Sequence, residues 1–297
     1  MRQSPGSLAA AFVEYRATPE WLAKAPRTRE EWERAWSYVG PAFGGCRPST
    51  VTLAQISAFR QMIEQNVSLR EAHRTIKIWR ALWRVAAALR YCVRDADPSL
   101  GVRNVEPEPR QSVWEHGEVV RLAKAAWRNG YRGLAALIAV AWDTQLSPVD
   151  VRKLTPADRE GDTFNVKRAK TGRAAIGTLG KRSVRLLDGY TSSLGVSIAP
   201  TAPIFRNRSG QSYSKDTLGD DFRNIRALVY GTKETRTLAD FRRSGTVEAV
   251  RGGAADKQIA SKMANSFDRS KFLAGTYAPV DLAAVRAADE ARRRGRK

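Results

Sequence analysis

The stretch Thr163-Phe-Asn-Val-Lys-Arg-Ala-Lys-Thr-Gly-Arg-Ala-Ala-Ile-Gly-Thr-Leu179 carries the clearest strand signal in this chain of 297 residues. Apolar and polar residues alternate over residues 163–168, Lys170-Thr-Gly172 is typical of a turn, and the alternation returns from Ala175. This pattern predicts a β-hairpin. Helical spacing dominates the sequence on both sides of it, so we expect a mainly α protein with a small antiparallel β-sheet.

The N-terminal third predicts helices over residues 28–39, 53–65 and 69–94. On the longest of these, an apolar stripe at helical spacing predicts a buried face, made of Ile78, Leu82, Val85, Leu89 and Cys92. An adjoining stripe is basic and consists of Arg70, Arg74, Lys77 and Arg84. The basic stripe is either a solvated face or a contact to nucleic-acid phosphates, and both interpretations stay open.

The helical pattern is interrupted between the N-terminal helices and the hairpin. Pro98, Gly101, Pro107 and Pro109 punctuate a polar stretch there, which is typical of a linker between domains. The chain is therefore predicted to contain a helical N-terminal domain, a linker, a second domain and a basic tail, at residues 1–104, 105–112, 113–281 and 282–297.

The charge balance favours a nucleic-acid partner. Lys and Arg number 51 against 30 Asp and Glu, a formal net charge of +21, which is too large for a typical metabolic enzyme and suits a polyanion. The longest apolar stretch, residues 134–142, is too short to span a bilayer, and the N-terminus lacks the apolar core of a secretory signal. We therefore expect a cytoplasmic, nucleoid-associated protein.

Cysteine and histidine are too scarce to form a metal site. Cys46 and Cys92 have no metal-ligand spacing and form no disulfide framework, and His73 and His116 are the only histidines. A catalytic triad that needs His is excluded from the sequence after residue 116. We expect neither a metal nor another cofactor.

A series of short motifs follows in order through the second domain. They are Thr144-Gln-Leu-Ser-Pro-Val-Asp-Val-Arg-Lys-Leu154, Ala169-Lys-Thr-Gly172, Ala239-Asp-Phe-Arg-Arg-Ser244, Ala264-Asn-Ser266 and Tyr277. In this order they resemble the catalytic domain of the tyrosine recombinases, the phage integrase family. The N-terminal helices resemble the core-binding domain of that family. The resemblance implies two domains that close as a clamp around duplex DNA. It also implies that the protein acts on DNA as a dimer or tetramer, or beside an active recombinase, and that it belongs to a mobile element.

The resemblance also implies a phosphoryl transfer that needs no metal. Tyr277 stands at the position of the nucleophile, which attacks a DNA phosphate and forms a 3′-phosphotyrosine link. Arg242 stands at the position of a clamp arginine, whose planar guanidinium matches the phosphate oxygens. Lys170, on the hairpin turn, stands at the position of the acid that protonates the leaving 5′ oxygen.

Three positions depart from the family's pattern. Ser147 stands where the first clamp arginine belongs, Ala239 where the first His belongs, and Asn265 where the second His or Trp belongs. Asn can still donate a hydrogen bond, whereas Ala transfers no proton. Losing one preorganised donor to a developing oxyanion costs on the order of 3 kcal/mol, about a hundredfold in rate or more, so Ser147 is the most serious departure.

Three further arginines near these motifs are candidate DNA contacts. They are Arg168, Arg173 and Arg243. Arg168 is expected to share a strand face with Lys170, and either Arg168 or Arg173 could reach the phosphate in place of the missing arginine. Arg152, five residues after Ser147, is expected to point elsewhere.

Two hypotheses about function stay open, and the first is favoured. In the first, the chain is a DNA-binding protein of this family with impaired catalysis, which holds or bends recombination sites, accompanies an active recombinase or represses transcription. In the second, it is an active integrase that exchanges DNA strands. Retention of Tyr277, Arg242 and Lys170 favours the second hypothesis. A basic RNA-binding protein is a third hypothesis, but the sequence has no RNA-stacking motif. The tail at residues 282–297 is either a solvated segment or docks on a neighbouring protomer.

Overall fold

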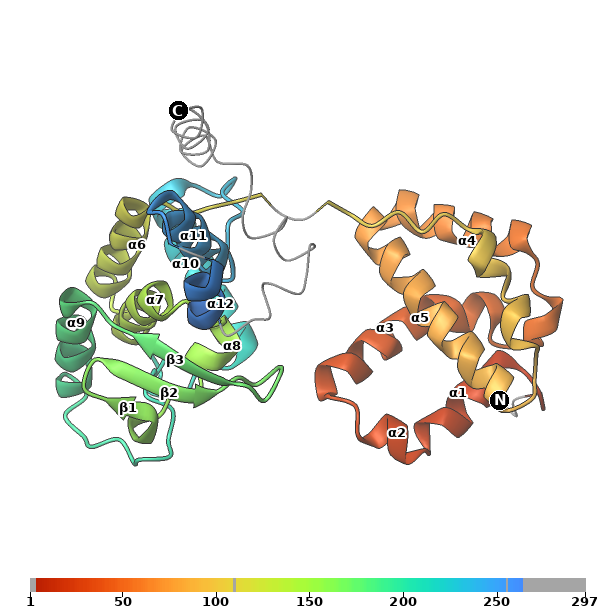
Figure 1. Ribbon diagram of the computed structural model, residues 1–297, viewed down its shortest axis with the longest axis horizontal. Helices are drawn as coiled ribbons and strands as arrows, with labels where there is room; N and C mark the ends of the chain where they lie inside the picture. The colour runs from red at the N-terminus through yellow and green to blue at the C-terminus, as the bar shows by residue number, and fades with distance from the viewer. Residues whose placement is uncertain (1–3, 109–110, 255, 264–297) are drawn as a thin grey trace, which may run out of the picture. The chain divides into compact units, whose positions relative to one another are not determined.

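The chain divides at Pro109–Arg110 into two units, each with its own hydrophobic core (Figure 1). The structure is a computed structural model that describes residues 4–108, 111–254 and 256–263. These residues are mainly helical and contain a three-stranded antiparallel sheet, so the predicted fold class is confirmed.

The first unit consists of helices joined by short connections. They are α1 (Leu8–Arg16), α2 (Pro19–Leu22), α3 (Pro26–Phe43), α4 (Leu53–Asn66) and α5 (Leu69–Ala88), with 3₁₀ turns at Pro48–Thr50, Arg94–Ala96 and Pro98–Gly101. Helix α5 is shorter than predicted because Arg90 takes a left-handed conformation, φ 63°, which helical residues do not adopt. Helix α3 is longer than predicted and begins at Pro26, where the fixed φ of proline suits the first turn.

The buried face of α5 differs from the predicted stripe. Of the five apolar residues in that stripe only Leu82 is fully buried, and the others are half-buried. The core-facing side centres on Ile76, Trp79 and Trp83, which contact α1, α3 and α4. The two indoles carry this face because each N–H also finds an acceptor: Trp79 Nε1 donates to Asp97 at 3.0 Å and Trp83 Nε1 to the Val93 carbonyl at 3.0 Å.

The second unit places helices around the sheet. Its elements are α6 (His116–Arg128), α7 (Arg132–Thr144), α8 (Pro148–Val151), β1 (Arg159–Glu160), β2 (Thr163–Lys167), β3 (Ala174–Thr178), α9 (Lys181–Ser192), α10 (Lys215–Tyr230), α11 (Asp240–Arg251) and α12 (Asp256–Met263), with a 3₁₀ turn at Pro156–Asp158.

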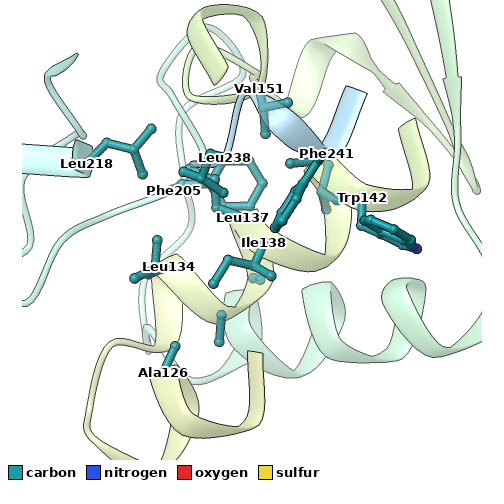
Figure 2. Close-up of a cluster of buried hydrophobic side chains, with 14 of the residues drawn as sticks. Ala126, Leu134, Leu137, Ile138, Trp142, Val151, Phe205, Leu218, Leu238 and Phe241 are labelled. Atoms are coloured by element: carbon teal, nitrogen blue, oxygen red, sulfur yellow. The ribbon is translucent and has the colours of Figure 1, made fainter. Parts of the chain in front are cut away.

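Helix α7 forms the centre of the second core. It is apolar on all sides because it is enclosed by α6, α9, α10 and α11 (Figure 2). The Trp142 ring from α7 meets the Phe241 ring from α11 edge to face, with centroids 5.5 Å apart. This contact fixes the start of α11 against the end of α7, where the motif at residues 144–154 begins.

The predicted hairpin is confirmed as β2 and β3. The strands are antiparallel, with Phe164 opposite Gly177 and Val166 opposite Ala175, and β1 pairs on the other edge of β2. A six-residue connection joins β2 to β3, closed by the Arg168 N–H, which donates to the Arg173 carbonyl at 2.9 Å. Helices α7 and α12 pack against β3 (Figure 1).

Arg236 joins the start of the second unit to the segment before α11. Its guanidinium donates to both oxygens of Glu118, at 2.7 and 2.8 Å, and to Glu234 at 2.7 Å. It also lies 3.9 Å from the centroid of the Trp114 ring. Hydrogen bonds from Arg236 lower the pKa of Glu118 and lower that of Glu234 to about 2.

Gly133→Ala is expected to destabilise the second unit by about 2 kcal/mol or more. A Cβ at this position would lie 2.0 Å from the backbone oxygen of Arg206, and a packed backbone relaxes only at high cost. The matched control is Gly219→Ala on α10, where a Cβ meets nothing within 4 Å and alanine should stabilise by up to about 1 kcal/mol. Urea unfolding of both variants checks the opposite signs, and equal effects would contradict this packing.

Arg236→Met is expected to lower the free energy of unfolding by about 2 kcal/mol near neutral pH, because it leaves two partly buried carboxylates without their cation. The control, Arg223→Met, removes an exposed ion pair with Asp220 and should cost less than about 0.5 kcal/mol.

The effect of Arg236→Met is expected to depend on pH. Folding lowers the pKa of Glu118 and Glu234, so their contribution is complete above their ordinary value of 4.5 and is lost as the pH falls through the lowered values, toward about 2 for Glu234. The difference in stability between the wild type and this variant should therefore shrink through that window. Thermal unfolding across the pH series measures it, and a constant difference would refute the assignment.

Candidate functional site

Asp150 connects the motif at residues 144–154 to the hairpin. Its buried carboxylate accepts a hydrogen bond from Ser147 Oγ at 2.6 Å and one from the Ala169 N–H at 2.8 Å. The Arg168 Nε lies 3.6 Å from the same carboxylate, as an ion pair. One carboxylate thus binds a helix start, a turn and a guanidinium.

Lys170 lies in the turn that this carboxylate anchors. Its side chain is exposed, whereas Arg168 is buried, so the expectation that the two share a strand face is wrong. The reason is that β2 ends at Lys167, and the chain turns before Lys170. The anchored turn presents an exposed ammonium group next to a buried guanidinium.

Arg242 reaches the same segment from α11. It is buried, and its Nη1 donates to the Gln145 carbonyl at 2.8 Å. The start of α11 is fixed by Asp240, whose carboxylate accepts from the Thr237 N–H at 2.6 Å. The structure therefore brings Arg242, Ser147 and the turn that carries Lys170 together around residues 145–150.

Gln145 has a left-handed backbone, φ 57°, at the end of α7. This conformation costs a residue with a Cβ about 1–2 kcal/mol. The Gln145 side chain is buried against Gly245 of α11, where a Cβ would lie 2.1 Å from its Cδ atom. Glycine at position 245 leaves room for this amide, whereas a Cβ there would require the Gln145 side chain to shift.

The structure describes one of the three remaining predicted catalytic positions. Ala239 is exposed and is the residue just before α11. Asn265 and Tyr277 lie outside the described residues, so their placement next to Arg242 stays a prediction.

The other candidate DNA contacts differ in exposure. Arg173 is exposed, while Arg243 is buried and donates to Gln111 at 3.0 Å. On α5, Arg70, Lys77 and Arg84 are exposed, and Arg74 is half-buried in an ion pair with Glu71 at 2.9 Å. The side chain of Arg152 donates to the Tyr213 carbonyl at 3.3 Å, in agreement with its exclusion from the site.

Sequence analysis missed the role of Asp150 and the pairing of Gln145 with Gly245. A weak signal for Asp150 was present, because Ser147-x-x-Asp150 has the spacing at which a helix start brings two polar side chains together. No local pattern predicts that Asp150 also contacts Ala169 and Arg168, since these residues lie in another element.

A second polar contact lies at the other end of the hairpin. Lys262 of α12 donates to Thr178 at 2.8 Å, and Thr178 is paired with Thr163, away from the turn at residues 168–173. Burial lowers the pKa of Lys262, and the nearby Asp143 carboxylate opposes this effect. This lysine is therefore not part of the cluster around Asp150.

The described residues contain no group of three or more His, Cys, Asp or Glu side chains placed to hold a metal ion. Within the same residues, each helix is too short or too polar to cross a membrane.

Comparison with known proteins gives matches among solved structures. No protein-family model matches the chain, and no curated protein matches it. A lambda integrase dimer bound to a COC′ core site matches with a TM-score of 0.76 and 15% identity, over 91% of this chain and 95% of that one. A Tn1549 transposon integrase in complex with transposon right end DNA matches with a TM-score of 0.74 and 14% identity, over 96% and 98%.

The XerA recombinase matches less closely, with a TM-score of 0.51 and 17% identity, over 96% of this chain and 98% of that one. The alignments extend over both units. The chain has the fold of the tyrosine recombinases.

Proposed function

We propose that this chain is a DNA-binding protein that acts in or regulates site-specific DNA recombination, with impaired strand cleavage. Three observations support the proposal. The chain has the recombinase fold, its net charge is +21, and the integrases that share this fold were solved in complex with DNA. The proposed partner is duplex DNA in the cytoplasm, with the chain acting as a dimer or tetramer on DNA, or beside an active recombinase.

The hydrogen bond from Ser147 to Asp150 carries the proposal of impaired cleavage. At this position an arginine would present a charged, two-pronged donor to the phosphate, whereas the serine hydroxyl already donates to a carboxylate at 2.6 Å. Ala239 adds to the deficit, because an exposed methyl group can neither donate nor accept a proton. Binding needs only cations near phosphates, so it survives these losses more easily than catalysis does.

The second candidate function is active strand exchange through a 3′-phosphotyrosine link. The observation in its favour is that the turn carrying Lys170 and the buried Arg242 both lie against residues 145–150. A protein that only binds DNA has no need for an acid and a guanidinium at one point. In this case Tyr277 would be the nucleophile.

A suicide DNA substrate separates the two functions. The full-length protein is incubated with nicked duplexes that trap a 3′-phosphotyrosine link, and covalent adducts are counted on denaturing gels. We expect few or no adducts, because the loss of one oxyanion donor lowers the rate about a hundredfold or more. Abundant adducts that disappear in Tyr277→Phe would refute impaired cleavage and support active strand exchange.

Affinity for duplex DNA is expected to fall steeply with salt, with a linear relation between log K and log salt concentration, because counterions are released from the phosphates. Lys77→Ala, on the exposed basic stripe of α5, should lower the slope by about one. The control, Arg27→Ala, removes an exposed guanidinium that is paired with Glu30 and should leave the slope unchanged. Fluorescence anisotropy measures both, and binding independent of salt would refute the proposed function.

A further inference from the structure

The loop at residues 206–212 packs against the turn between α6 and α7. A Cβ on Gly133 would lie 2.0 Å from the backbone oxygen of Arg206, so the two backbones touch there. The Arg208 side chain extends this contact, because its guanidinium lies 4.2 Å from the centroid of the Tyr131 ring. Two segments distant in sequence therefore form one surface of the second unit.

This surface is basic because neither segment contributes an acid. Residues 119–142 and residues 189–215 contain no Asp or Glu. Arg128 and Arg132 beside the turn are exposed, and so is Arg208 on the loop. Positive charge therefore collects where the two segments meet, and no carboxylate of either segment balances it.

The backbone around Arg208 is held by hydrogen bonds within its own loop. The Asn207 side-chain oxygen accepts from the Ser209 N–H at 3.0 Å and from the Gln211 N–H at 2.9 Å. The Asn207 N–H donates in turn to the Gln211 carbonyl at 2.8 Å. These bonds close a tight turn that contains Arg208, so the position from which its side chain extends is fixed before any ligand binds.

Two guanidinium groups at this surface lie over aromatic rings. Arg208 lies over Tyr131, and Arg132 lies 5.6 Å from the centroid of the Trp127 ring. A guanidinium that stacks through its flat face keeps the N–H groups at its edge for other partners. Among the described residues, neither side chain donates a hydrogen bond or forms an ion pair. Both therefore retain N–H donors for an anion.

The basic surface lies at the opposite end of α7 from the candidate site. Helix α7 begins at Arg132, and Gln145, whose carbonyl binds Arg242, follows its last residue. Its 13 residues extend over about 20 Å. This distance equals about six base pairs of duplex DNA, at 3.4 Å each. One duplex is therefore long enough to contact both ends of the helix.

We propose that Arg132 and Arg208 form a second contact surface for DNA phosphates on the second unit, separate from the candidate site. The proposal rests on the proposed function, because it takes duplex DNA as the ligand. Phosphate is the chemical group that fits, since the planar guanidinium edge matches its oxygens in a two-pronged contact. Such contacts position a protein on DNA without reading its sequence.

Two competing explanations make different predictions. If the arginines only cover the two aromatic rings, replacing them should lower stability and leave the salt dependence of DNA binding unchanged. If they act only through the overall charge of the protein, any exposed arginine outside ion pairs should matter equally. Arg185 on α9 is such a residue among those that the structure describes, so Arg185→Met is the matched control.

The test measures duplex DNA binding over a salt series by fluorescence anisotropy, with the full-length wild type, Arg132→Met, Arg208→Met and the double variant. We expect each single variant to lower the slope of log K against log salt concentration by about one and the affinity about tenfold. The double variant should lower the slope by about two, because each guanidinium neutralises a phosphate of its own. The control Arg185→Met should leave the slope unchanged.

A second pair of variants tests the ring below Arg208. Tyr131→Phe keeps an aromatic platform, whereas Tyr131→Leu removes it. The leucine variant should bind duplex DNA about two- to fivefold more weakly than the phenylalanine variant, because the guanidinium is no longer held in one orientation. Equal affinities of the two folded variants would contradict a contact made by the stacked guanidinium.

The outcomes separate this proposal from the proposed function. An unchanged slope in the double variant, or an equal reduction in Arg185→Met, would overturn the second contact surface while leaving the proposed function intact. Failure of the wild type to bind duplex DNA would overturn both. Circular dichroism identifies any variant that unfolds. If a methionine variant unfolds, glutamine at the same position replaces it, and an unchanged slope in that folded variant would equally overturn the contact.

Discussion

A buried carboxylate is costly unless cations and hydrogen-bond donors surround it, and Asp150 meets this requirement with groups from three places. Ser147, the residue just before α8, supplies a hydroxyl, Ala169 supplies a backbone N–H from the turn, and Arg168 supplies the charge. The carboxylate is satisfied only when α8 and the hairpin lie in one relative position. The position of the hairpin turn relative to residues 147–150 therefore depends on this carboxylate.

The opposite wall of the site is fixed by a comparable set of contacts. Trp114 donates through its backbone N–H to Ser244 of α11 at 2.7 Å, and Arg236 stacks on the Trp114 ring. These contacts hold α11 so that Arg242 can reach the Gln145 carbonyl. The result is an anchored set of segments, with Lys170 exposed on the turn of the hairpin.

The sequence predicted those parts of the fold that depend on local spacing. The hairpin was predictable because alternation and a Lys-Thr-Gly turn act over neighbouring residues. The face of α5 was predicted poorly, because a five-residue apolar stripe gave no weight to Trp79 and Trp83, whose large rings decide the packing. The ends of helices depend on single backbone conformations, such as that of Arg90, which spacing does not reveal.

The candidate site was likewise predictable only in part. The order of the motifs placed Ser147, Lys170 and Arg242 in one domain, and the fold brings their segments together around residues 145–150. The contacts that give the site its character join residues distant in sequence, so no local pattern contains them. Asp150 and Arg168 are 18 positions apart, and Gln145 and Gly245 are 100 apart.

These distant contacts also bear on how two residues of the candidate site should be understood. A serine at position 147 considered alone is a lost cation, and a glutamine at position 145 considered alone is a strained backbone. In the fold, Ser147 shares an oxygen of Asp150 with Arg168, and Gln145 fills space that Gly245 leaves open. Each of these two residues therefore has to be interpreted with its partner: Ser147 with the Asp150 carboxylate that also accepts from the turn of the hairpin, and Gln145 with the glycine of α11.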